Sequence, residues 1–203
     1  MKNVSIFLAS SIREFEKDRL DITSFVYLLN RLYKGLLEID LEICEHQSNA
    51  MSIRRSQDEY NEIIRRCDYF YLLAGRRMGR YTEEEFHVAR GQFEKTAKQP
   101  KIYTYFEQVD APEESLTKFR QMLWNQYDYF TPDYTHIDTI KLNIILELKR
   151  DGFIDSEVRF ADGSVTAGGE KLMELDNIPI YARHEELNRL KAQLRSWTGG
   201  WKS

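Results

Sequence analysis

Residues 69–79 read YFYLLAGRRMG, in which an apolar run of six residues ends at a turn rich in glycine and arginine. A short run without polar positions is typical of a strand whose two faces are both buried, as in a parallel sheet. Beyond the turn, apolar residues recur at helical spacings, which predicts a helix. These residues are Phe86, Ala89, Phe93 and Ala97. The segment is therefore expected to form a strand, a turn and a helix.

The same alternation of strand and helix patterns runs through most of the chain. The expected strands are residues 4–9, 39–43, 69–74 and 101–106, with a short fifth strand within 127–134. Helical patterns follow them at 22–36, 53–67, 86–97, 112–126 and 137–148. Five alternating pairs imply an α/β fold with a mostly parallel five-stranded sheet and helices on both faces.

The character of the strands also predicts their order. Residues 4–9 and 69–74 are solid apolar runs, whereas 39–43 places Asp40 and Glu42 on one face. A strand with one polar face belongs at an edge of the sheet. This fits the flavodoxin-like order 2-1-3-4-5, in which ligands bind beyond the carboxyl ends of strands 1 and 3.

After about residue 152 the pattern changes. Apolar residues alternate on both sides of Asp162-Gly163, which predicts a β-hairpin on a two-residue turn. A last helix is expected to carry a narrow apolar stripe. The stripe consists of Leu187, Leu190, Leu194 and Trp197. We therefore expect a domain at 1–152, and at 153–203 an appendage that could also connect to a further domain, a partner protein or a second subunit.

Composition excludes several classes of protein. Of the 203 residues 42% are hydrophobic, which is enough to bury a core. A net charge of −4 argues against a phosphate-neutralising surface, so nucleic acid is not an expected partner. No uncharged apolar run approaches the ~18 residues that cross a bilayer, and the N-terminus does not resemble a signal peptide, so we expect no membrane association and a cytoplasmic location. Cys44 and Cys67 are expected to be buried thiols rather than metal ligands.

Familiar catalytic motifs are absent. The sequence contains no Gly-x-Gly-x-x-Gly, no phosphate-binding Gly-x4-Gly-Lys-Ser/Thr, no Gly-x-Ser-x-Gly and no His-Glu-x-x-His. The remaining candidates for functional residues are the polar side chains that follow strands 1 and 3. Ser10 and Ser11 offer hydroxyls beside a helix start, a place suited to phosphate or ribose oxygens. The alternative is that one of them only caps the first helix.

Three glutamates follow strand 3, at Glu83, Glu84 and Glu85. Their negative charges suit the beginning of a helix. On a helix whose buried stripe contains Phe86, Glu84 points to solvent while the other two flank the stripe, and periodicity does not choose between them. Glu85 has a structural explanation as well, because Thr82-x-x-Glu85 matches a capping box.

Three segments of this sequence resemble the TIR-like domains of bacterial defence proteins. They are IFLASS at 6–11, EKDR at 16–19 and YTEEEFHVA at 81–89, within a resemblance that covers roughly residues 3–150. The resemblance implies a domain that hydrolyses or cyclises NAD, releases nicotinamide and acts in antiviral innate immunity as a homo-oligomer. It places the catalytic role on Glu85, four residues before Ala89.

The resemblance also implies a substrate site and a type of chemistry. NAD is the substrate, and no cofactor and no metal are expected. The substrate-binding residues are then Ser10, Ser11, Arg13, Gly75, Arg76, Arg77, Tyr81 and Thr82. A single carboxylate suffices, since nicotinamide leaves as a neutral ring and the carboxylate stabilises an oxocarbenium-like ribose. Two alternatives stay open: a nucleoside 2-deoxyribosyltransferase-like enzyme, and a non-catalytic TIR-like module for self-association.

Overall fold

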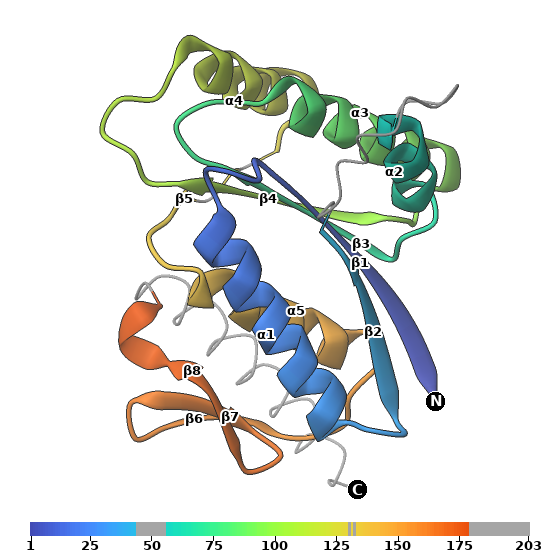
Figure 1. Cartoon of the computed structure of the whole chain (residues 1–203), viewed down its shortest axis with the longest axis vertical. Coiled ribbons are helices and arrows are strands. Elements are labelled where there is room, and N and C mark those ends of the chain that lie inside the picture. The colour runs from blue at the N-terminus through green and yellow to red at the C-terminus, as the bar shows by residue number, and fades with distance from the viewer. Residues whose placement is uncertain (44–55, 130, 132, 179–203) are drawn as a thin grey trace, which may run out of the picture.

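A parallel five-stranded sheet forms the centre of the molecule (Figure 1). The computed structural model of the chain describes residues 1–43, 56–129, 131 and 133–178. The strand order is β2-β1-β3-β4-β5, and every neighbouring pair is parallel. The strands are β1 (Lys2–Ser10), β2 (Leu37–Glu42), β3 (Tyr69–Ala74), β4 (Lys101–Glu107) and β5 (Asp133–Tyr134). The flavodoxin-like fold class predicted from the sequence is confirmed.

Helices cover both faces of the sheet (Figure 1). One face carries α1 (Glu16–Leu32) and α5 (Asp138–Arg150). The other carries α2 (Ser56–Ile64), α3 (Arg80–Thr96) and α4 (Glu114–Tyr127). Side chains of β1 and β3 enter both layers, because successive residues of a strand point to opposite faces. This double burial explains why both strands are solid apolar runs.

The second strand lies at the edge of the sheet, as its alternating sequence predicts. Leu37 and Ile39 are buried, while Glu38 and Asp40 are exposed. β5 is shorter than the predicted segment 127–134 and pairs with β4 through only two residues. The carboxyl ends of β1 and β3 therefore lie side by side in the middle of the sheet, where the winding reverses.

A second, antiparallel sheet follows α5. It consists of β6 (Val158–Ala161), β7 (Ser164–Ala167) and β8 (Glu170–Glu174). The predicted hairpin is confirmed, since Asp162 and Gly163 have φ angles of 53° and 72° in the turn. β8 was not predicted, because only Met173 of this largely charged strand is buried. Buried residues of this sheet and of the α1 and α5 layer form one apolar cluster.

Two expectations for the C-terminal part are not tested. The predicted helix with the stripe from Leu187 to Trp197 lies outside the described residues. The division into 1–152 and 153–203 stays a prediction. Within the described residues, no helix is long and apolar enough to cross a membrane.

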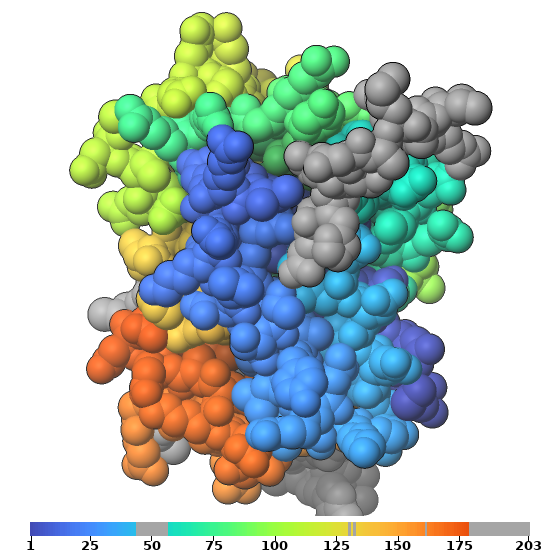
Figure 2. Space-filling model, in the orientation of Figure 1, coloured from blue at the N-terminus to red at the C-terminus, as the bar shows by residue number. Residues whose placement is uncertain are grey.

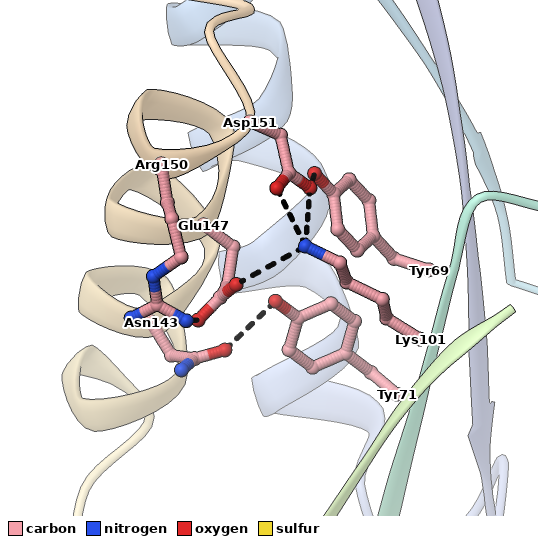
Figure 3. A network of polar contacts seen from close by, with 7 residues as sticks. All are labelled: Tyr69, Tyr71, Lys101, Asn143, Glu147, Arg150 and Asp151. Carbon is pink, nitrogen blue, oxygen red and sulfur yellow. Dashed lines mark hydrogen bonds and ion pairs between the residues drawn. The ribbon is translucent and has the colours of Figure 1, made fainter. Parts of the chain in front are cut away.

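A charged network joins α5 to the amino ends of β3 and β4 (Figure 3). Lys101 Nζ lies 2.5 Å from Asp151 Oδ1 and 3.8 Å from Glu147 Oε2. The Tyr69 hydroxyl donates a hydrogen bond to Asp151, and Arg150 Nη1 contacts Glu147 Oε1 at 2.5 Å. This network lies at the opposite end of the sheet from the candidate site described below, so we assign it to stability.

Candidate functional site

Helix α3 begins earlier than the sequence predicts. Gly79 is its N-cap, with φ −74° and ψ 141°, and the backbone N–H of Glu83 donates to the Gly79 carbonyl. No side chain caps this end of the helix. The predicted capping box of Thr82 and Glu85 is therefore wrong, because both residues already lie within the helix, beyond its cap. Glu85 consequently has no capping role.

Glu85 is a buried carboxylate held by helix α2. Its side chain is 5% exposed, and Gln57 Nε2 donates a hydrogen bond to Glu85 Oε1 at 3.2 Å. Gln57 is itself 9% exposed and lies 3.4 Å from Asn61 Oδ1 through the same amide nitrogen. Burying a carboxylate is costly unless it accepts hydrogen bonds, so the amide of Gln57 stabilises Glu85 in place.

Glu84 belongs to the same group of side chains. Asn61 Nδ2 donates to Glu84 Oε1 at 3.0 Å, and Glu84 is half-buried. The prediction that Glu84 points freely to solvent is therefore wrong, because α2 packs against this flank of α3. We call Gln57, Asn61, Glu84 and Glu85 the α2–α3 polar cluster.

The third glutamate behaves differently. Glu83 is half-buried, and its side chain makes no hydrogen bond or ion pair with the described residues. Periodicity left Glu83 and Glu85 equivalent, and the structure distinguishes them. Of the two, Glu85 is the one that is buried and fixed by an amide.

The loop between β3 and α3 is fixed from two sides. Glu14 Oε1 accepts a hydrogen bond from the Arg76 backbone N–H at 2.6 Å, and the Arg76 carbonyl accepts one from the Glu113 N–H at 2.8 Å. The Met78 N–H donates to Ser115 Oγ at 3.2 Å. Hydrogen bonds thus connect the loop after β1 and the beginning of α4 to the predicted substrate-binding loop.

Because Gly75 has no side chain, the carboxylates of Glu14 and Glu107 can lie close to the backbone of this loop. A Cβ atom at this position would lie 2.5 Å from Glu14 Oε1 and 3.0 Å from Glu107 Oε2. Burial and the neighbouring charges of Asp18 and Glu14 raise the pKa of Glu107. Burial also raises the pKa of Asp18, although the Tyr134 hydroxyl donates a hydrogen bond to its carboxylate at 3.2 Å. The carboxylates of Glu14 and Asp18 therefore both lie near that of Glu107, and Glu14 and Glu107 border Gly75.

The hydroxyls of Ser10 and Ser11 make hydrogen bonds to groups other than Glu85. Ser10 Oγ accepts a hydrogen bond at 3.0 Å from Arg19, a buried residue of α1 on the opposite face of the sheet. Ser11 Oγ accepts one from the Glu14 N–H at 3.4 Å and so closes the turn before α1. Helix α1 itself has no side-chain cap. The structure therefore gives the Ser10 hydroxyl a structural partner and separates it from the face that carries Glu85.

The remaining predicted residues divide into exposed and buried ones. Thr82 and Gly75 are buried. The exposed ones are Arg13, Arg76, Arg77 and Tyr81, together with the neighbouring Arg80. Among the described residues, none of these four arginine side chains has a hydrogen-bond or ion-pair partner. His, Cys, Asp and Glu residues form no group of three that could hold a metal ion within the described ranges.

The amide that holds Glu85 is not among the residues that the sequence predicts for the site. Within the predicted helix 53–67, Gln57 shares the helical spacing of Tyr60 and Ile64, which by itself indicates a buried face and no functional role. A glutamine on a buried stripe is itself a signal, because a buried amide needs a polar partner. Asn61 lies one turn further along the same flank. Cys67 is buried as predicted, which raises the pKa of its thiol to about 12, whereas Cys44 lies outside the described residues.

Comparisons with known proteins give similar folds at low identity. No protein-family model and no curated protein matches the chain. The CMP N-glycosidase BcmB of Clostridium botulinum is 17% identical, with a TM-score of 0.47 over 71% of this chain and 99% of that chain. The TIR domains of the activated Roq1 resistosome are 13% identical, with a TM-score of 0.45 over 71% of this chain and 99% of that chain. Similarities at this level assign no activity.

Proposed function

We propose that this chain cleaves the bond between nicotinamide and ribose in NAD, with Glu85 as the catalytic carboxylate. The observation that carries the proposal is the placement of Glu85: it is buried near the start of α3, beyond the carboxyl end of β3, and an amide of α2 fixes its orientation. The sequence resemblance of segments 6–11 and 81–89 to TIR-like domains supports the same residue. The fold supports this location of the site, since proteins with this sheet topology bind ligands where the winding of the sheet reverses.

The chemistry needs one negative charge at the ribose. When the C1′–N bond breaks, its electron pair goes to nicotinamide, which leaves as a neutral ring, so no acid is required. The positive charge then develops on the ribose ring, and a fixed carboxylate stabilises it. Water attacks C1′ and gives up a proton to yield ADP-ribose, or an adenine nitrogen attacks instead and closes a ring. The hydrogen bond from Gln57 limits the rotation of Glu85 and so maintains its orientation.

The exposed arginines suit the other end of this substrate. Arg76 and Arg77 follow β3, and Arg13 follows the neighbouring strand β1. A guanidinium group pairs with phosphate through two parallel hydrogen bonds. We assign these residues to the pyrophosphate of NAD. The proposed biological setting is antiviral defence, in which copies of the chain assemble before they act.

The experiment measures nicotinamide released from NAD by chromatography. Glu85→Gln keeps an oxygen that accepts the bond from Gln57 but removes the charge, so we expect a melting temperature close to that of wild type and at least about 100-fold less nicotinamide. Glu83→Gln is the matched control on the same turn and should retain most activity. Equal activity of Glu85→Gln and wild type would exclude Glu85 as the catalytic carboxylate.

A panel of deoxynucleosides extends the same assay. If wild type releases bases from deoxynucleosides and leaves NAD intact, the nucleoside 2-deoxyribosyltransferase-like alternative replaces our proposal. If neither substrate is cleaved by assembled protein, the chain acts as a self-association module.

A further inference from the structure

A cavity lies on the other side of α3 from Glu85. It has a volume of about 180 Å³, is partly open to solvent, and is bordered by α3, α4, β4 and the segment after α4. Four aromatic residues, two aliphatic residues and one arginine line it. They are Phe86, Phe93, Tyr127, Tyr129, Ile102, Leu123 and Arg90. The α2–α3 polar cluster takes no part in this lining, so the cavity is distinct from the proposed catalytic site.

The size of the cavity suits a single aromatic ring. An apolar cavity of about 150 Å³ is large enough to bind benzene, so about 180 Å³ accommodates one ring with a small fused or attached group. A water molecule finds few hydrogen-bond partners in this lining, since the Tyr129 hydroxyl already donates to the Ile102 carbonyl at 3.0 Å. An aromatic molecule instead restores the dispersion contacts that the lining side chains lack.

Arg90 adds a preference for electron-rich rings. Its guanidinium carbon lies 4.6 Å from the centre of the Tyr127 ring and 5.4 Å from that of Phe93. It is therefore held at the wall of the cavity against aromatic faces, and Glu94 pairs with it at 3.1 Å. A cation fixed in this way attracts the face of another ring, most strongly that of an indole.

We propose that this cavity is a binding site for a small planar aromatic molecule, such as an indole or a phenol. The site has no part in the bond cleavage proposed above. Its ligand would contact Phe86, which directly follows Glu85 on α3 but points toward α4 instead of α2. Binding there is therefore measurable whether or not the chain cleaves NAD.

The test uses indole as the probe and cyclohexanol as a compact ring without π-electrons. Binding to the full chain is followed by ligand-observed NMR and by the rise in melting temperature. We expect indole to bind at least about 10-fold more tightly than cyclohexanol. Ile102→Trp fills the cavity and should weaken indole binding by at least about 10-fold, whereas Trp124→Ala, on the exposed side of α4, should leave it unchanged.

A second variant covers the case in which the larger side chain prevents folding. Arg90→Leu removes the cation from a half-exposed position and should reduce the preference for indole over cyclohexanol by several-fold. The proposal is overturned if indole does not bind to wild type, if cyclohexanol binds equally well, or if a folded Ile102→Trp variant binds indole as wild type does.

Discussion

Replacing Lys101 by Met should destabilise the protein by about 2 kcal/mol. Removing one partner from a fully buried ion pair costs about 3–5 kcal/mol, whereas an exposed pair contributes at most about 1 kcal/mol. The network of Figure 3 lies between these limits: the side chain of Lys101 is 38% exposed, that of Asp151 25% and that of Glu147 only 2%. Arg150 stays beside Glu147 after the substitution and reduces the loss.

Thermal unfolding provides the assay for Lys101→Met. In a protein of this size, 1 kcal/mol corresponds to about 2–4 °C, so the variant should melt about 4–8 °C below wild type. The control introduces the same substitution into a Glu147→Gln, Asp151→Asn background, where the cation has no carboxylate to pair with and the loss should fall below about 1 kcal/mol. An equal loss in both backgrounds would refute the electrostatic explanation, and packing of the lysine stem near the Tyr69 ring would then account for the effect.

The pH dependence gives a second check on the same variant. Burial favours the neutral form of Asp151, but hydrogen bonds from Lys101 and Tyr69 outweigh it and lower the pKa of this carboxyl. A carboxyl with a lowered folded-state pKa contributes stability above its unfolded value, and this contribution is lost as the pH falls through the folded value. The difference between wild type and Lys101→Met should therefore shrink below about pH 4.

Three further predictions concern the candidate site and the assembly. Gly75→Ala should lower the free energy of unfolding by about 1–2 kcal/mol, because its Cβ displaces Glu14 and meets Phe15 Cζ at 3.0 Å; denaturant titration measures this. Glu107→Gln should raise stability at pH 7 by roughly 0.5 kcal/mol after solvent screening. Because the pKa of Glu107 is raised in the folded state, the protein loses stability as the pH rises through this pKa and Glu107 ionises. The stability gained by Glu107→Gln should therefore vanish at low pH, where Glu107 is protonated and neutral like Gln. NAD cleavage per molecule should rise with protein concentration in a dilution series, and constant specific activity would contradict assembly.

The sheet could be predicted because the buried faces of each strand are visible as apolar residues in its own sequence. β1 and β3 are apolar on both faces and β2 on one, which is enough to place β2 at an edge of the sheet. The separation of Ser10 from Glu85 could also have been predicted, since side chains of a strand alternate and Ser10 has the parity of Ile6 and Leu8 in the α1 layer.

The details of the candidate site could not be predicted in the same way. The beginning of α3 depends on the backbone of Gly79, which a side-chain pattern does not record. The bond between Gln57 and Glu85 depends on how α2 and α3 pack, and periodicity describes one helix at a time. Periodicity therefore left Glu83 and Glu85 equivalent, and only the tertiary contact shows that Glu85 is the one that is buried and bonded to Gln57.

The placement of β3 has a consequence for local motion. This strand is buried along its whole length, lies between β1 and β4, and supplies side chains to the apolar layers on both faces. Neither layer can open without exposing one face of β3, so its amide hydrogens should exchange with solvent only when the sheet as a whole comes apart. The loop that carries the arginines begins at the end of this strand, and it is therefore anchored to a strand whose amides we expect to exchange slowly.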